Sequence, residues 1–215
     1  MERLAAFGVE ARRTAHGTFT PDDWRVEVGP AMQALSRAGG VAVVHASAAA
    51  LSAEGRRWRV EASDGRVWFA PTVVLATGAA PALPGLPSRI AGLVEAIEPW
   101  RRQLTPVLGP PPPLTLRAPG LYVVPTSGGA LVGATMGGGR RVLAPDPENS
   151  RRQVEDGHAL SGLEGRPGAP RVGIRGGTAD GLPMAGPAGE PGLHLALAPL
   201  RNGWLLGPMG ARVVG

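Results

Sequence analysis

The chain alternates short apolar segments with turns that are rich in glycine and proline. Residues 58–62 alternate apolar with polar side chains, residues 66–70 are apolar after Arg66, and a Ser-Asp-Gly turn at 63–65 separates the two segments. An Asp-Gly turn between two strand-like segments predicts a β-hairpin. Residues 72–78 are apolar almost without a break, which predicts a strand that is buried on both faces.

The same periodicities predict further elements: a helix over 28–38, a short buried strand over 41–44, a second hairpin formed by 120–125 and 130–135, and a surface helix over 147–160. In the first helix, Pro30 falls near the first turn, where its missing N–H costs no hydrogen bond. Gly39 and Gly40 are expected to end that helix. In the last helix, the charged side chains of 151–156 predict a solvated face.

The final stretch, residues 171–215, has the most distinctive pattern. In order, it predicts a short strand that ends on Arg175, a turn-rich segment over 178–187, an apolar strand over 192–198, a tight turn at 201–203 and a helix that opens at Trp204. A strand that leads through a glycine turn into a helix offers free N–H groups and the positive end of the helix dipole to an anion. Arg175 and Arg201 would make the neighbouring pocket strongly electropositive.

Composition excludes several classes of function. The 215 residues are enough for one large or two small domains. There is no cysteine, which excludes disulfides, thiol nucleophiles and thiolate metal sites. The sequence also has no metal-spaced His, Asp or Glu cluster, so we expect no metal. No apolar run is long enough to span a bilayer, and we expect a cytoplasmic protein without a membrane partner.

The formal net charge is +5, and every basic residue except histidine is an arginine. A basic chain can indicate nucleic-acid binding. Here the arginines are scattered in pairs instead of forming one stripe, which argues against a nucleic-acid partner.

Two segments of the final stretch resemble a known family: IRGGTADGLPMAGP at 174–187 and LALAPLRNGWLLGP at 195–208. Together they are similar to the C-terminal signature of FAD-dependent amino-acid oxidases of the glycine oxidase and D-amino-acid oxidase type. Ala76-Thr77-Gly78 also resembles the Ala-Thr-Gly motif of flavoproteins with two dinucleotide-binding domains.

The resemblance implies a mixed α/β (α+β) fold, in which a partial FAD-binding domain accompanies an antiparallel β-sheet substrate domain. The expected division is an incomplete FAD-binding domain over 21–80 and 171–215, a substrate domain over 81–170, and an N-terminal segment, 1–20, that the pattern leaves unassigned. The implied cofactor is FAD.

The resemblance also assigns roles to residues. Arg175 would bind the substrate carboxylate through two parallel charge-assisted hydrogen bonds, and Arg201 and Tyr122 are further substrate-side candidates. The positions implied for FAD binding are Ala48, Gly78, Pro199, Leu200, Arg201, Asn202, Gly203, Trp204 and Leu205. Two alternatives stay open: Arg175 could form a structural ion pair with Asp180, which itself is expected to stabilise a turn, and Tyr122 could be an ordinary strand aromatic.

The chain departs from the family pattern in two places. The family begins with a strand–Gly-x-Gly-x-x-Gly–helix unit that holds the FAD diphosphate, and no such motif opens this sequence. Residues 101–109 resemble the family's Pro-Val-Arg-Gly-Gln crossing strand, with Leu108 in place of the arginine and Pro110 in place of the glutamine.

The leading hypothesis is therefore an FAD-dependent oxidoreductase without its N-terminal nucleotide-binding unit. It would oxidise a small amine or amino acid by hydride transfer to flavin, with reoxidation by molecular oxygen. No side-chain acid–base catalyst is required, because the protein's part is positioning and electrostatics. The first alternative is a non-catalytic, truncated remnant or subunit that needs a homo-oligomer or an upstream-encoded chain to bind FAD. A second, less favoured alternative is an oxidase of modified tRNA bases.

Overall fold

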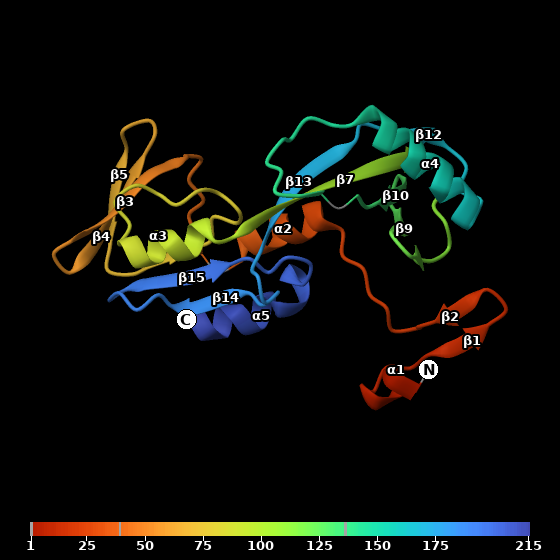
Figure 1. The fold of residues 1–215 in the computed structure, drawn as a ribbon, viewed down its shortest axis with the longest axis horizontal. Coiled ribbons are helices and arrows are strands. Elements are labelled where there is room, and N and C mark those ends of the chain that lie inside the picture. The colour runs from red at the N-terminus through yellow and green to blue at the C-terminus, as the bar shows by residue number, and fades with distance from the viewer. Residues whose placement is uncertain (1, 39, 136) are drawn as a thin grey trace. The chain divides into compact units, whose positions relative to one another are not determined.

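A computed structural model describes residues 2–38, 40–135 and 137–215 (Figure 1). The chain divides into two compact units, Met1–His45 and Ala46–Gly215. The first unit contains two short helices and one two-stranded antiparallel hairpin: α1 (Glu2–Ala6), β1 (Arg12–Thr14), β2 (Gly17–Phe19) and α2 (Val28–Arg37).

The first unit confirms one sequence prediction and corrects another. The predicted helix over 28–38 is α2, although none of its side chains is buried. The predicted buried strand over 41–44 is wrong, because these residues form no strand and Val41 is 64% exposed. A strand requires a neighbour for its N–H and C=O groups, and no described residue pairs with this segment.

The second unit is built around a seven-stranded antiparallel sheet. Its strands are β7 (Glu98–Leu108), β8 (Leu116–Ala118), β9 (Leu121–Thr126), β10 (Gly129–Gly133), β11 (Gly137–Gly138), β12 (Arg166–Pro167) and β13 (Arg171–Gly177). The long strand β7 is central: β10 and β11 pair with one of its edges, and β12 and β13 with the other. The second predicted hairpin is confirmed as β9 and β10. Strand β13 joins this sheet, although the resemblance groups it with 178–215.

Helix α4 (Pro147–Ser161) covers one face of this sheet, over a core of Val107, Val123, Ala130, Val132 and Leu163. Buried amide groups also join α4 to β7. The Thr105 hydroxyl donates to Gln153 Oε1 (2.7 Å), and Gln153 Nε2 donates to the Gln103 carbonyl (2.9 Å). Gln103 Nε2 in turn donates to the Asp146 carbonyl (2.7 Å). Because these buried polar groups are paired with one another, they fix which face of β7 lies against the helix.

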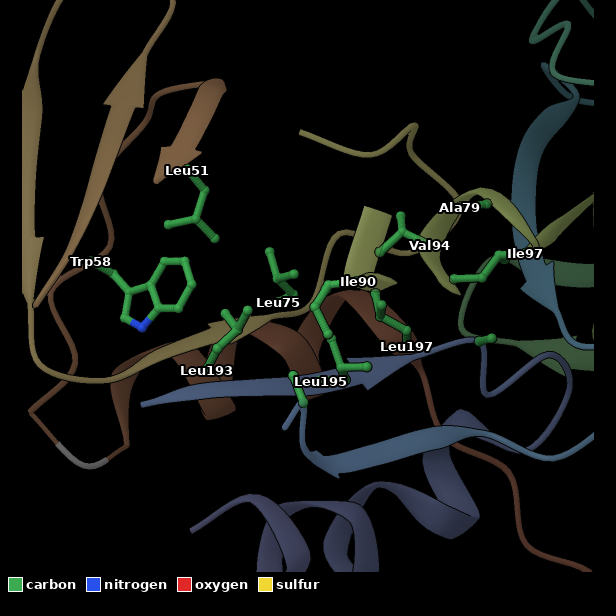
Figure 2. Close-up of a cluster of buried hydrophobic side chains, with 12 residues drawn as sticks. Leu51, Trp58, Leu75, Ala79, Ile90, Val94, Ile97, Leu193, Leu195 and Leu197 are labelled. Carbon is green, nitrogen blue, oxygen red and sulfur yellow. The ribbon is translucent and has the colours of Figure 1, made fainter. Parts of the chain in front are cut away.

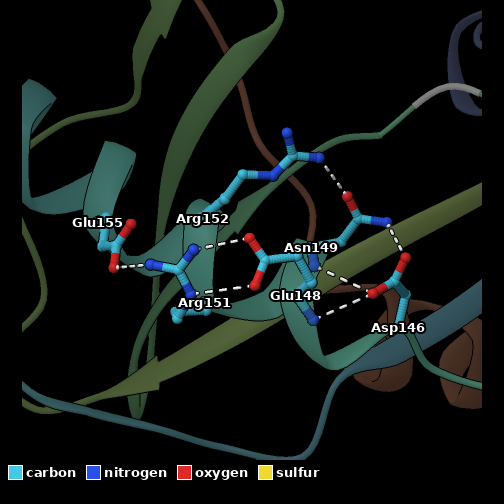
Figure 3. Close-up of polar contacts among 6 residues, drawn as sticks. All are labelled: Asp146, Glu148, Asn149, Arg151, Arg152 and Glu155. Atoms are coloured by element: carbon cyan, nitrogen blue, oxygen red, sulfur yellow. Dashed lines mark hydrogen bonds and ion pairs between the residues drawn. The ribbon is translucent and has the colours of Figure 1, made fainter.

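The start of α4 explains the charged pattern seen in its sequence (Figure 3). The Asp146 side chain accepts hydrogen bonds from the backbone N–H groups of Glu148 (3.0 Å) and Asn149 (3.2 Å), as an N-cap does. Arg151 forms ion pairs with Glu148 (2.6 Å) and Glu155 (2.5 Å) at the helix surface. This is the predicted solvated face, and such exposed pairs add little stability.

Two three-stranded sheets complete the second unit. One contains β6 (Val73–Leu75), β14 (Met184–Pro187) and β15 (Leu193–Leu197), and the other contains β3 (Ala48–Glu54), β4 (Arg57–Ala62) and β5 (Val67–Ala70). In the first, β15 runs parallel to β6 and antiparallel to β14. The β4–β5 hairpin is the one predicted from the Asp-Gly turn. Two helices, α3 (Ser88–Glu95) and α5 (Gly203–Val214), accompany these sheets.

A hydrophobic core joins these elements (Figure 2). Leu51, Trp58, Leu75, Ile90 and Leu193 are among its buried members, and they come from β3, β4, β6, α3 and β15. The prediction that 72–78 is buried on both faces is wrong, since Val74 is 43% exposed. The combination of antiparallel sheets, a parallel strand pair and helices is the mixed α/β class that the sequence predicts.

We expect Gln153→Leu to lower the free energy of unfolding by about 1–3 kcal/mol, because the Thr105 hydroxyl loses its acceptor and the Gln103 carbonyl loses this donor. The neighbouring exposed arginine provides the control, and Arg152→Leu should change that free energy by no more than about 0.5 kcal/mol. Urea denaturation of the three proteins measures both effects. Equal stability of the Gln153 and Arg152 variants would contradict the role of the amide contacts.

Candidate functional site

The face of β7 that lies away from α4 carries the candidate site. Successive side chains of a strand point to opposite faces of its sheet. Gln103 and Thr105 bind α4, so Trp100, Arg102 and Leu104 lie on the other face. We call this second face of the seven-stranded sheet the site face.

Strand pairing brings two predicted substrate-side residues to the site face. Arg175 of β13 lies opposite Trp100, and Gly173 lies opposite Arg102. On the other edge of β7, Gly133 of β10 lies opposite Leu104, and Tyr122 of β9 lies opposite Gly133. A Cβ atom added at Gly133 would lie 3.3 Å from the Tyr122 Oη. The glycine therefore leaves room for the tyrosine ring beside the centre of the sheet.

The electrostatics show that these side chains share one environment. Burial raises the pKa of the Tyr122 phenol, while the positive charges of Arg175 and Arg102 lower it in part. The pKa of Arg102 is lowered, first by burial and then by Arg175; Tyr122 opposes this shift, and Arg201 adds to it. Arg175 thus acts on both Arg102 and Tyr122, and Arg201 acts on Arg102.

Arg102 is the least satisfied of these groups. Its Nε and Nη2 atoms are buried, and no hydrogen-bond partner reaches them from the part of the chain that the structure describes. Within the same described residues, Arg175 has no ion pair either. Asp180, the alternative partner of Arg175, instead accepts a hydrogen bond from the Leu182 N–H (3.0 Å), which with the Thr178 hydroxyl lowers the pKa of its carboxyl. Asp180 is therefore a turn residue, as predicted.

The predicted flavin turn is attached to the end of β13. The Leu200 N–H donates to the Gly176 carbonyl (3.2 Å), and the Asn202 N–H donates to the Pro199 carbonyl (2.8 Å). Ala198 and Leu200 have positive φ angles of 53° and 44°, a region that residues with a side chain rarely adopt. Backbone strain of this kind is concentrated at functional sites.

Three strand ends meet at this turn. A Cβ atom added at Gly176 would lie 3.4 Å from the Gly78 carbonyl oxygen and 3.5 Å from Ala198 Cα. The end of β13 thus lies beside the residues that follow β6 and β15. Gly78 has a φ of +66° with open space where a side chain would be, which leaves its backbone accessible.

The structure brings most of the predicted site residues together. Tyr122, Arg175 and Arg201 act on Arg102, and the turn containing Pro199, Leu200, Asn202 and Gly203 adjoins them. Trp204 and Leu205 are exposed in the first turn of α5. Ala48 lies elsewhere, at the start of β3.

Arg102 is a residue that the sequence interpretation missed. The crossing strand was placed at 101–109, whereas Pro99-Trp-Arg-Arg-Gln103 has the proline, arginine and glutamine of the family pattern at the same spacing. In that alignment Arg102 occupies the position of the glycine. The family pattern can therefore be recognised over residues 99–103 in the sequence. The sequence does not show, however, whether Arg102 lies toward α4 or away from it.

The donor set fits the flavin ring and an anionic substrate, and does not fit a metal. Arg102, Arg175 and Tyr122 lie on the site face, and the strained turn and the accessible Gly78 backbone adjoin the end of β13. Among the described residues there is no group of three or more His, Asp or Glu side chains that could hold a metal ion. In that same part of the chain, no helix has both the length and the apolar character needed to cross a bilayer.

Comparisons with solved structures show similarity to amino-acid and amine oxidases. Glycine oxidase from Geobacillus kaustophilus matches with a TM-score of 0.67 and 28% identity, over 80% of this chain and 47% of that protein. Glycine oxidase from Bacillus cereus (TM-score 0.65, 20% identity, 77% and 46% covered) and iminodiacetate oxidase from Chelativorans (0.55, 19%, 76% and 46%) share the fold. The chain spans about half the length of these proteins.

A search of curated protein sequences gave no match. The sequence model of the FAD dependent oxidoreductase family matches residues 2–215, nearly the whole chain. Because this match covers nearly all of the sequence and the fold agrees with it, the chain belongs to the FAD-dependent oxidoreductase family.

Proposed function

We propose that this chain supplies the substrate site and the flavin-facing turn of an enzyme that oxidises a small amine or amino acid of the glycine or D-amino-acid type. The observation that carries this proposal is the Arg175 guanidinium, which has no ion pair with any described residue and shares the site face with the Tyr122 phenol. An arginine without a carboxylate partner in the described protein offers its fork of donors to a substrate carboxylate.

In this proposal the residues bind and orient the substrate. Arg175 holds the carboxylate, and the neutral Tyr122 hydroxyl donates a hydrogen bond to it. Arg201 adds positive charge beside the turn. Gly78 and the 199–205 turn would hold FAD, with Ala48 as a backbone contact near the adenine.

When bound, FAD would accept the hydride lost from the substrate Cα and pass two electrons, with two protons, to molecular oxygen, which would leave as hydrogen peroxide. The substrate, which also loses an amine proton, would become an imine, and water would hydrolyse this imine to a carbonyl compound and ammonia or, from a secondary amine, a primary amine. The protein contributes position and electrostatic stabilisation, so no side-chain base is required.

A second candidate is a subunit that binds FAD only together with another chain or a second copy of itself. One observation favours it: β6 is paired only with β15 among the described strands. The open edge of β6 could accept a strand from such a partner.

FAD titration of the purified chain tests the proposal. We expect protein-bound flavin bands in the visible spectrum, bleached under anaerobic conditions by glycine, sarcosine or a D-amino acid, with peroxide formed on admission of air.

Arg175→Leu should raise KM by about 100-fold, since it removes a charge-assisted pair, while the flavin bands remain. A chain that stays colourless alone but binds FAD with its partner supports the second candidate. A coloured chain that none of these compounds reduces contradicts the proposed activity.

Tyr122 provides an independent test, because it is the only tyrosine in the sequence. We expect its tyrosinate absorbance to appear at a pH above 10.0, the ordinary value, in the folded protein. Arg175→Leu should raise the midpoint further by removing a charge that favours the phenolate. Since the pKa is raised on folding, this contribution to stability is present below pH 10 and is lost as the pH rises through the folded value. Tyr122→Phe should not show this fall in stability at high pH. A folded-state titration midpoint of Tyr122 at or below 10.0 would contradict its burial at the site face.

A further inference from the structure

The site face holds more positive charge than one substrate carboxylate needs. Arg175 alone offers a complete fork to a carboxylate. Arg102 adds a second guanidinium, whose Nε and Nη2 are buried without a hydrogen-bond partner from the described residues. Arg201 carries a third positive charge, which also lowers the pKa of Arg102.

The strand register places Arg102 and Arg175 as diagonal neighbours on the site face. Arg102 lies opposite Gly173, and Arg175 is two residues further along the same strand. Diagonal neighbours of this kind are about 7–8 Å apart at their backbones. A Cβ atom at Gly173 would meet nothing within 4 Å, so the space opposite Arg102 is open. The two guanidinium groups can thus hold separate groups of one small molecule.

The energetics point to a ligand with matching charge. The positive charges of Arg102 and Arg175 repel each other, and the buried donors of Arg102 are without partners among the described residues. Both effects destabilise the folded protein unless a ligand compensates them. The charges of Arg175 and Arg201 and the burial of Arg102 all disfavour the cationic form of Arg102. A bound dianion would remove these penalties together, whereas a single carboxylate on Arg175 would leave Arg102 unsatisfied.

We propose that the substrate carries a second carboxylate, which Arg102 binds while Arg175 binds the carboxylate next to the amine. The substrate class is then an amino dicarboxylic acid. This inference rests on the proposed function for the amine and its oxidation, and it adds Arg102 as the residue that determines specificity.

Binding of redox-inert acids tests the inference separately from catalysis. Malonate, succinate and glutarate are titrated calorimetrically into the protein, with and without FAD, beside propanoate, butanoate and pentanoate at equal ionic strength. We expect at least one diacid to bind on the order of tenfold more tightly than the monoacid of the same length. In Arg102→Leu that ratio should fall to near one. Arg152→Leu removes the same charge from the exposed surface of α4 and should keep the ratio of the native protein.

Two measurements on the native protein keep the test decisive if Arg102→Leu fails to fold. The diacid should raise the thermal midpoint more than its matched monoacid, and it should raise the pH at which Tyr122 ionises, because added negative charge disfavours the phenolate. Equal effects of diacid and monoacid, with or without FAD, overturn the inference. A diacid preference that survives in Arg102→Leu also overturns it.

The outcomes separate this inference from the proposed function. A protein that binds FAD and oxidises only monocarboxylic amines overturns the role of Arg102 and leaves the oxidase proposal standing. A protein with the diacid preference that binds no FAD, alone or with a partner, overturns the oxidase proposal and retains the dicarboxylate site.

Discussion

The site depends on the buried contact between α4 and β7. Gln103 and Thr105 are held against the helix by hydrogen bonds to Asp146 and Gln153, and the alternation of the strand then places Arg102 on the opposite face. A register slip of one residue would exchange the two faces. It would drive Arg102 into the apolar core under α4 and expose an amide where the site has a guanidinium. The hydrogen bonds of these amides therefore determine which side chains lie on the site face, although the amides themselves lie on the opposite face.

The site and the turn beside it carry groups that disfavour folding. The buried donors of Arg102 lack partners among the described residues, and Ala198 and Leu200 occupy a backbone region that costs free energy. The core under α4 and the core around Trp58 and Leu193 offset these costs. Strand β13 links the two, because its Gly173 lies opposite Arg102 and its Gly176 carbonyl accepts from the Leu200 N–H. Unsatisfied charge and strain of this kind are concentrated at functional sites.

Local signals allowed much of the fold to be predicted. The Asp-Gly hairpin, helix α4 and the strand–turn–helix at the C-terminus each follow from residues that are close in sequence. Val41 and Val74 were predicted as buried because apolar runs do not reveal whether a neighbouring strand exists. The sequence motif identified Arg175, Arg201 and Tyr122 as site candidates. It could not identify Arg102, since the side of a strand that becomes a site depends on a helix about fifty residues later, as Gln153 shows for Gln103.

The central claim is that Arg102 and Arg175 of the site face bind one small dianion. A crystal structure of the protein with succinate or glutarate tests it most directly. The account predicts one diacid on the face of β7 away from α4, with a carboxylate on each of the two guanidinium groups. A structure in which Arg102 is paired with a carboxylate of the protein itself, or in which it faces α4, would contradict it.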